Sequence, residues 1–209
     1  MQKEKVSIFW FRRDLRLDDN TALNKQYFGL QSDYDKVTSI LLVNKNLSVE
    51  FNNKMMEKFS NLSILRINSN SIEILDVTSN INLLGLFCYF NDLEVLDISK
   101  SINLKTLVAS FNNLGQIDFS NSTQLTYVNI AFNNISEIDI SLLINLTYLE
   151  CNNNPLNYSQ NSQILLDLNS HQNSNGVFKS SISGGGQLTN AAQAAKNQLQ
   201  SRGWTIIGI

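Results

Sequence analysis

The chain has 209 residues, of which 43% are hydrophobic and only 16% are charged, and its formal net charge is −2. This composition supports a substantial core but excludes a broadly basic surface for nucleic acid, and no segment has the roughly 20 successive apolar residues of a membrane-spanning helix. The charged amino terminus lacks the apolar run of a signal peptide, so the cytoplasm is the default expectation for its location.

The first element expected is a strand at residues 6–11, followed by an arginine-rich loop and a helix that begins at Asp18 or Asp19 and ends near Gln26. A second strand follows at residues 37–43. A strand–helix–strand unit of this kind brings its two strands together in parallel. We therefore expect the two strands to pair, so that residues 1–36 cap the amino-terminal end of the fold.

The sequence VSIFWFRRDLRLDDNTAL, which begins at Val6, closely resembles the opening of the DNA photolyase and cryptochrome family, and a weaker likeness continues to residue 47. In that family the segment begins a doubly wound domain, whereas a helical domain several hundred residues downstream holds the flavin and the DNA. No such domain follows here, so a photolyase remnant is only a remote functional alternative. The residues that match the motif are Arg12, Arg13, Asp14, Arg16 and Asp19.

A repeat of 21 residues dominates the chain from residue 37 to residue 158. Five strong repeats begin with leucine and carry asparagine eight positions later. A weaker repeat precedes them at Val37, and an insertion at residues 51–61 lengthens its step to 25 residues. A fixed period indicates a stack of one small structural unit. The leucines are Leu62, Leu83, Leu104, Leu125 and Leu146, and the asparagines are Asn70, Asn91, Asn112, Asn133 and Asn154.

When the leading leucine of each repeat is counted as position 0, apolar residues recur at positions 0, 3, 5, 10, 13 and 15. The alternation around positions 3 and 5 predicts a half-buried strand with positions 2, 4 and 6 outward, and a second extended piece at positions 13 and 15. The pattern L-x-x-L-x-[ICA]-x-x-N-x-[LI] resembles the leucine-rich repeat, most of all its short bacterial form in secreted and cell-surface proteins. The resemblance implies an α/β solenoid: a right-handed coil with a parallel concave sheet, and a secreted or surface location.

Three polar or aromatic columns are expected to be structural. The five asparagines carry both a donor and an acceptor, so they can form a ladder that satisfies the backbone of successive turns. Aspartate at position 14, as in Asp118, is expected to accept from a nearby backbone amide rather than bind Ca²⁺, which needs six to eight oxygen ligands. Phenylalanine at position 7 is expected to form a stacked column at the turn, made of Phe90, Phe111 and Phe132.

The two cysteines, Cys88 and Cys151, occupy the same position of their repeats and lie three repeats apart. Because parallel strands are about 4.8 Å apart, their backbones are separated by roughly 14 Å. A disulfide needs Cα atoms within about 7 Å. We therefore expect two buried thiols, with neither a disulfide nor a metal site.

After residue 158 the repeat ends, and residues 159–209 are expected to form a carboxy-terminal cap. Residues 159–170 contain a short buried apolar segment, and a flexible glycine-rich loop follows at residues 184–186. A helix with Thr189 as its N-cap ends at Gly203 and precedes a final strand that begins at Trp204. These elements resemble the caps that close bacterial leucine-rich-repeat proteins, because the last apolar layer of a solenoid must be covered. His171 is expected to be a loop residue.

The outward strand positions remain as candidates for function, because solenoids bind partners on the surface that their repeats build together. Tyr127 and Tyr148 occupy position 2 of neighbouring repeats, and exposed aromatic side chains anchor many interfaces. Alternatively, such cross-strand pairs serve only to stabilise the sheet. The candidate partner-binding residues are Arg66, Phe87, Tyr89, Val108, Tyr127, Tyr148 and Glu150.

These observations favour a non-enzymatic, monomeric interaction module that binds a protein, a peptide or a glycan on its concave face. The alternative is a structural or adhesive segment of a secreted surface protein. No acid–base pair, Cys–His pair or metal-ligand spacing indicates catalysis, so neither enzymatic activity nor a cofactor is expected.

Overall fold

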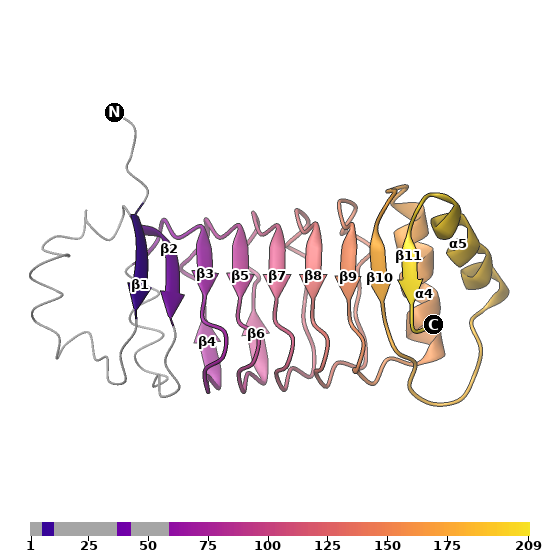
Figure 1. The fold of residues 1–209 in the computed structure, drawn as a ribbon, viewed down its shortest axis with the longest axis horizontal. Helices are drawn as coiled ribbons and strands as arrows, with labels where there is room; N and C mark the ends of the chain where they lie inside the picture. The colour runs from indigo at the N-terminus through magenta and orange to yellow at the C-terminus, as the bar shows by residue number, and fades with distance from the viewer. Residues whose placement is uncertain (1–5, 11–36, 43–58) are drawn as a thin grey trace, which may run out of the picture.

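The computed structural model describes residues 6–10, 37–42 and 59–209, with the backbone alone described in the first two segments. The described chain is a parallel β-solenoid in which successive repeats add three-residue strands to one long sheet (Figure 1). Nine strands form this sheet, in the spatial order β1 (Val6–Trp10), β2 (Val37–Leu42), β3 (Ile64–Arg66), β5 (Gly85–Phe87), β7 (Thr106–Val108), β8 (Tyr127–Asn129), β9 (Tyr148–Glu150), β10 (Val177–Lys179) and β11 (Thr205–Ile207).

The pairing register keeps equivalent repeat positions opposite one another. Leu86 pairs with Leu65 on one side and with Leu107 on the other, and each partner is 21 residues away. In β3, β7, β8 and β9 the central residue is buried, whereas its two neighbours are half-buried. This alternation follows from the period of two in a strand, which sends successive side chains to opposite faces.

The core is a set of stacked apolar columns, as the 21-residue pattern predicts. All five leading leucines are fully buried, and positions 3, 5, 10, 13 and 15 are buried in each of the four repeats that begin at Leu62, Leu83, Leu104 and Leu125. Cys88 and Cys151 are free and lie in this core. Burial raises the pKa of each thiol from 9.0 to about 12, because the core disfavours the thiolate.

The predicted ladder of asparagines is confirmed, and it joins each repeat to the one before. The Asn112 side-chain nitrogen donates to the carbonyl oxygen of Ala109 in its own repeat (3.1 Å) and to that of Cys88 in the preceding repeat (3.0 Å). Its side-chain oxygen accepts from the Leu93 backbone N–H (3.1 Å). Asn91, Asn133 and Asn154 make the same contacts.

The second extended piece forms regular strands in only two of the described repeats. These are β4 (Ile74–Asp76) and β6 (Val95–Asp97), which pair in parallel. In the four repeats that end this piece with an aspartate, its carboxylate accepts from the backbone N–H two residues later, as expected. The serine hydroxyl first, and then this amide, hold the pKa of Asp97 and Asp139 below the usual value, whereas at Asp118 the amide makes the larger contribution to the lowered pKa. Each of these turns therefore has a local hydrogen bond, whether or not the extended piece before it pairs as a strand.

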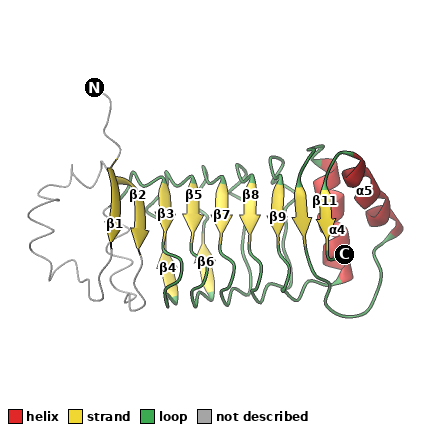
Figure 2. Ribbon diagram, viewed as in Figure 1, coloured by secondary structure: helices red, strands yellow, loops and turns green. Residues whose placement is uncertain are grey.

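Two helices lie at the carboxy-terminal end of the solenoid (Figure 2). The first, α4 (Tyr158–Ser170), corrects the expectation of a short buried apolar segment: it is a 13-residue helix whose N-cap is Asn157. Its buried residues include Asn161, Ile164, Leu165 and Leu168, which are spaced as one helical face. No helix of the described chain is long and apolar enough to cross a membrane.

The second helix, α5 (Asn190–Ser201), begins after Thr189, whose hydroxyl accepts from the Ala192 backbone N–H, as the sequence predicts. It contacts α4 and precedes β11. Strand β10 was not expected, and it extends the sheet between β9 and β11. His171 is the C-cap residue of α4, and its Nε2 lies 3.2 Å from the Ser141 carbonyl oxygen.

At the other end, β1 and β2 pair in parallel, as expected from the strand–helix–strand pattern. Ile40 of β2 lies opposite Leu65 of β3, which confirms the 25-residue step of the imperfect repeat. The helix expected to end near Gln26 and most of the insertion at residues 51–61 lie outside the described residues.

Candidate functional site

We call the outward surface of strands β3 to β10 the strand face; it is the surface expected to be concave. All seven candidate partner-binding residues lie on it, and all seven are half-buried. They form two clusters, one around Phe87 and one around Tyr148. Val108 of β7 lies between them. The residues that the periodicity predicts to point outward therefore lie on one face, whereas the grouping of their side chains emerges only in the structure.

The second cluster is built on a stacked pair of tyrosines. Tyr127 of β8 lies directly opposite Tyr148 of β9 in the parallel register. Their ring centroids are 4.1 Å apart and their planes differ by 7°. The separation is close to the spacing of about 4.8 Å between neighbouring strands, so the sheet itself holds the rings in contact.

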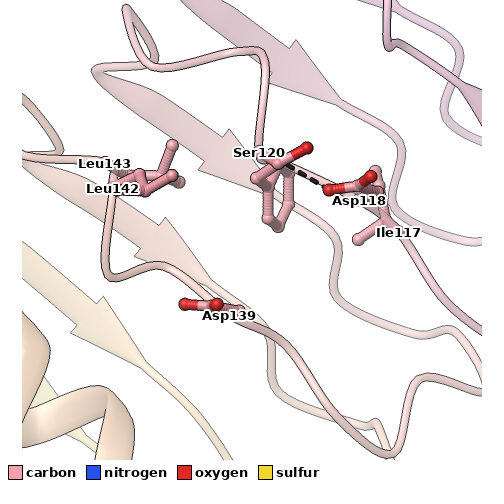
Figure 3. A pocket seen from close by; sticks show the side chains of 7 residues that line it. Ile117, Asp118, Ser120, Asp139, Leu142 and Leu143 are labelled. Carbon is pink, nitrogen blue, oxygen red and sulfur yellow. Dashed lines mark hydrogen bonds between the residues drawn. The ribbon is translucent and has the colours of Figure 1, made fainter.

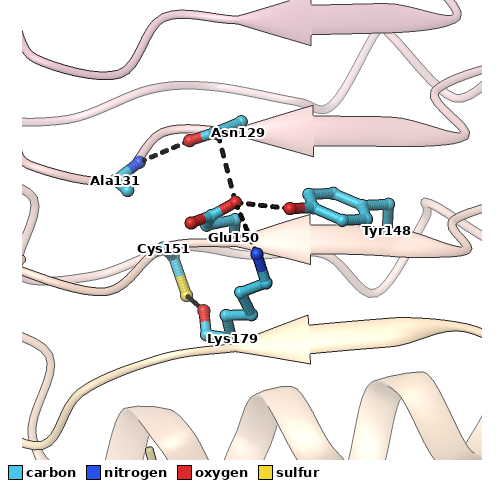
Figure 4. A network of polar contacts seen from close by, with 6 residues as sticks. All are labelled: Asn129, Ala131, Tyr148, Glu150, Cys151 and Lys179. Carbon is cyan, nitrogen blue, oxygen red and sulfur yellow. Dashed lines mark hydrogen bonds and ion pairs between the residues drawn. The ribbon is translucent and has the colours of Figure 1, made fainter. Parts of the chain in front are cut away.

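The Glu150 carboxylate is the shared acceptor of the polar groups in this cluster (Figure 4). Its Oε2 accepts from the Tyr148 hydroxyl, from the Asn129 side-chain amide (3.2 Å) and from the Lys179 ammonium (3.3 Å). The Lys179 ammonium also lies 5.4 Å from the Tyr148 ring centroid. Three donors on one carboxylate oxygen restrict the rotamers of every side chain involved. The cluster is consequently pre-organised before any partner arrives.

Lys179 was missed by the sequence reasoning. It lies opposite Glu150 because β10 pairs with β9, although 29 residues separate the two positions in sequence. The 21-residue period does not extend this far, so it could not have placed Lys179. The local sequence offers only two adjacent apolar residues, Val177 and Phe178, before Lys179.

Burial raises the pKa of Tyr127 from 10.0 to about 12, with a further contribution from neighbouring Tyr148. The pKa of Tyr148 is also raised, first by burial and then by its hydrogen bond to the Glu150 carboxylate. Both phenols therefore stay protonated at neutral pH. Tyr148 can act as a donor to Glu150, and the Tyr127 hydroxyl is a neutral group.

The first cluster contains Arg66 and Phe87. The guanidinium carbon of Arg66 lies 4.5 Å from the Phe87 ring centroid, which is a cation–π contact. The Phe87 ring leans over Gly85, because a Cβ atom at that position would be only 3.1 Å from the ring carbon Cε2. The absence of a side chain at Gly85 thus decides where this ring lies.

The predicted column of phenylalanines is stacked, and it runs along the surface beside the first cluster. Phe90 and Phe111 have ring centroids 4.2 Å apart, and Phe111 and Phe132 are 4.1 Å apart. The three side chains are 49%, 38% and 42% exposed. Tyr89 meets Phe90 edge-on at 5.7 Å, so the column is continuous with the strand face.

All three phenylalanines have a left-handed backbone, with φ between 54° and 56°. Ser69 and Asn153, which occupy the same repeat position, share this conformation. A left-handed residue other than glycine costs about 1–2 kcal/mol, and bulky residues are unusual there. The sequence therefore places large apolar rings where asparagine or glycine would suit the backbone better.

A small pocket between two successive repeats lies away from the strand face (Figure 3). It encloses about 70 Å³ and includes Asp118, Ser120, Asp139 and Leu142 among its lining residues. Sites for drug-sized ligands have about 300–1,000 Å³. Asp118 and Asp139 each already accept from a turn amide. Within residues 59–209 no three His, Cys, Asp or Glu side chains gather as a metal site.

Solved structures of two bacterial proteins share this architecture. A leucine-rich-repeat protein of Leptospira interrogans matches with a TM-score of 0.63 at 18% identity, over 83% of this chain and 49% of that one. An internalin of Listeria monocytogenes matches with a TM-score of 0.52 at 18% identity, over 80% of this chain and 55% of that one. The chain thus spans about half the length of these structures. The fold is a parallel β-solenoid of the leucine-rich-repeat type.

Comparison with protein-family models and with curated proteins gave no match. None of these findings supports the resemblance of the amino-terminal segment to the photolyases. Its motif residues, Arg12, Arg13, Asp14, Arg16 and Asp19, lie outside the described residues.

Proposed function

We propose that the protein is a non-enzymatic interaction module that binds a protein, a peptide or a glycan on its strand face. The observation that carries this proposal is the pre-organised cluster of Tyr127, Tyr148, Glu150 and Lys179. Binding energy in interfaces concentrates on tyrosine, tryptophan and arginine side chains held in place before contact. A rigid sheet also lowers the entropic cost of ordering such side chains on association.

The alternative is a structural or adhesive segment without a single ligand. In that case the stacked tyrosines serve only the sheet, as cross-strand pairs do in many proteins. The two functions differ in what the rings contribute. A purely structural pair contributes stability, whereas a binding pair contributes affinity for a defined partner.

The test compares two double variants for capture of partners by chemical cross-linking in cell-surface extracts. Tyr127→Ala with Tyr148→Ala removes the stacked pair from the strand face. Ile102→Ala with Ile144→Ala removes two exposed apolar side chains (55% and 59%) outside that face and serves as the control. We expect at least one cross-linked partner to fall about tenfold or more with the tyrosine variant only, because hot-spot truncations cost about 2 kcal/mol or more.

Circular dichroism must show that both variants keep the fold of the wild-type protein. A partner list that is the same for the wild type and the tyrosine variant would contradict the proposal. In that case, a loss of stability in the tyrosine variant alone would support the structural alternative.

A further inference from the structure

On the strand face, aromatic rings lie over position 2 of the repeat on β5, β8 and β9, but not on β7, which lies between β5 and β8. The ring on β5 belongs to Phe87, which leans over Gly85 at position 2 of the repeat. Tyr127 on β8 and Tyr148 on β9 occupy the same position. On β7, between Phe87 and Tyr127, position 2 is Thr106. The column therefore lacks one ring.

The two rings beside this gap make their stacking contacts on the sides away from it. Phe87 meets Arg66 of β3, and Tyr127 meets Tyr148 of β9. Because the strands follow the order β3, β5, β7, β8, β9, the other face of each ring is directed toward β7. Two aromatic faces are thus directed toward each other across Thr106.

The separation matches the thickness of one more ring. Neighbouring rings of this protein stack with centroids 4.1–4.2 Å apart. Strands β5 and β8 are two strand spacings apart, or roughly 9.6 Å. A single ring above Thr106 would therefore lie about 4–5 Å from each neighbour. Thr106 and Val108 are short, half-buried side chains beneath this position.

Charge and exposure indicate the class of partner. Among the described residues, Arg66 has no ion pair, and its recorded contact is with the Phe87 ring. The exposed column of Phe90, Phe111 and Phe132 continues from Tyr89 on the same surface. A contiguous exposed apolar ridge is typical of a surface that another protein covers.

We propose that the strand face binds a protein that inserts one aromatic side chain above Thr106, between Phe87 and Tyr127, and places an acidic residue beside Arg66. This inference rests on the proposed function and names the chemistry of the partner. The inserted ring completes the aromatic column, and its neighbouring carboxylate forms an ion pair with the Arg66 guanidinium.

The first test fills the gap from within the chain. Thr106→Phe places a ring between Phe87 and Tyr127, and we expect the midpoint of thermal unfolding to rise by about 2–4 °C because new aromatic contacts form. Thr123→Phe makes the same chemical change at a half-buried turn position outside the strand face and should leave the midpoint within about 1 °C. A lower midpoint for Thr106→Phe would show that no room exists, which would overturn the inference.

The second test uses three blocked tripeptides as probes, followed by amide NMR of the whole chain. Glu-Trp-Glu should give saturable shifts at Phe87, Thr106 and Tyr127, and Lys-Trp-Lys should bind about two- to fivefold more weakly, because it cannot pair with Arg66. Glu-Leu-Glu should give no saturable shift there. Thr106→Phe should abolish the effect of Glu-Trp-Glu, and Thr123→Phe should preserve it.

Three results of this second test would overturn the inference. The first is the absence of saturable shifts with Glu-Trp-Glu, and the second is the same binding by Thr106→Phe. The third is saturation of these amides by a glucuronic acid disaccharide but not by the peptides, which would indicate a saccharide surface. If the Tyr127→Ala/Tyr148→Ala variant loses a cross-linked partner that Thr106→Phe retains, the proposed function stands while this inference fails.

Discussion

At the scale of single residues, asparagine at position 8 shows how one side chain can connect two repeats. Asn112 contacts backbone atoms of its own repeat and of the repeat before it, and it is only 7% exposed. Its removal would leave the buried Leu93 amide without this partner, whereas the carbonyl oxygens of Cys88 and Ala109 would each keep one donor, from Asn91 and Asn133. A buried group without a partner costs about 1–3 kcal/mol.

Asn112→Ala should therefore lower the free energy of unfolding by about 1–3 kcal/mol, because the buried Leu93 N–H loses its partner and two carbonyl oxygens each lose one of two donors. Urea denaturation followed by circular dichroism measures this change. Asn113→Ala alters an exposed neighbour and should change stability by less than about 0.5 kcal/mol. Equal losses for the two variants would be inconsistent with a ladder that stabilises the stack.

Some side-chain contacts can be predicted from the 21-residue period and others cannot. The asparagine ladder follows from a column that repeats at a fixed period. The contact of Arg66 with Phe87 does not, because it depends on the missing side chain of Gly85. The phenylalanine stack was predicted, but its exposure of 38–49% depends on the left-handed backbone that turns the rings outward.

At the scale of elements, the carboxy-terminal segment departs most from expectation. Ile164, Leu165 and Leu168 fit a short apolar run as well as a helical face, and buried Asn161 conceals the helical period. Strand β10 has only three residues, too few to show an alternation. Helix α5 was predictable because Thr189 and Gly203 give it clear start and stop signals.

A substitution at Gly176 can test how the carboxy-terminal segment packs on the solenoid. A Cβ atom at Gly176 would lie 2.5 Å from the ring of Trp204, which is 4% exposed and donates its Nε1–H to the Asn173 carbonyl oxygen. Gly176→Ala must displace that ring, so we expect a loss of about 1–3 kcal/mol in urea denaturation. Gly185→Ala has no heavy atom within 4 Å of the new Cβ and should be neutral. An unchanged midpoint for Gly176→Ala would mean that Trp204 repacks without cost.

At the scale of the whole molecule, the solenoid buries two thiols in one continuous core. Their pKa is about 12 in the folded chain against 9.0 for an ordinary cysteine thiol, so the unfolded chain loses these protons first. Stability is then fully present below pH 9 and is lost as the pH rises toward 12. The slope approaches about 1.4 kcal/mol per pH unit for each thiol.

The double variant with Cys88→Ala and Cys151→Ala should lose less folding stability as the pH rises above 9. Alanine is tolerated at the equivalent position of another repeat, where Ala109 is fully buried. Urea midpoints between pH 9 and pH 10 are the informative measurement, because Tyr127 adds its own loss only above the ordinary tyrosine pKa of 10.0. The variant should lose less stability over this interval than the wild type. Parallel curves would exclude the thiols as the cause.

The amino-acid sequence alone determined the solenoid, its apolar columns and its asparagine ladder. The physical reason is that equivalent positions 21 residues apart must align if every repeat is to bury the same face. Only the tertiary structure decided which outward side chains meet: Lys179 with Glu150, and the Phe87 ring above Gly85. Those contacts depend on strand pairing across irregular chain lengths and on the space left by a missing side chain, and neither is encoded in the period.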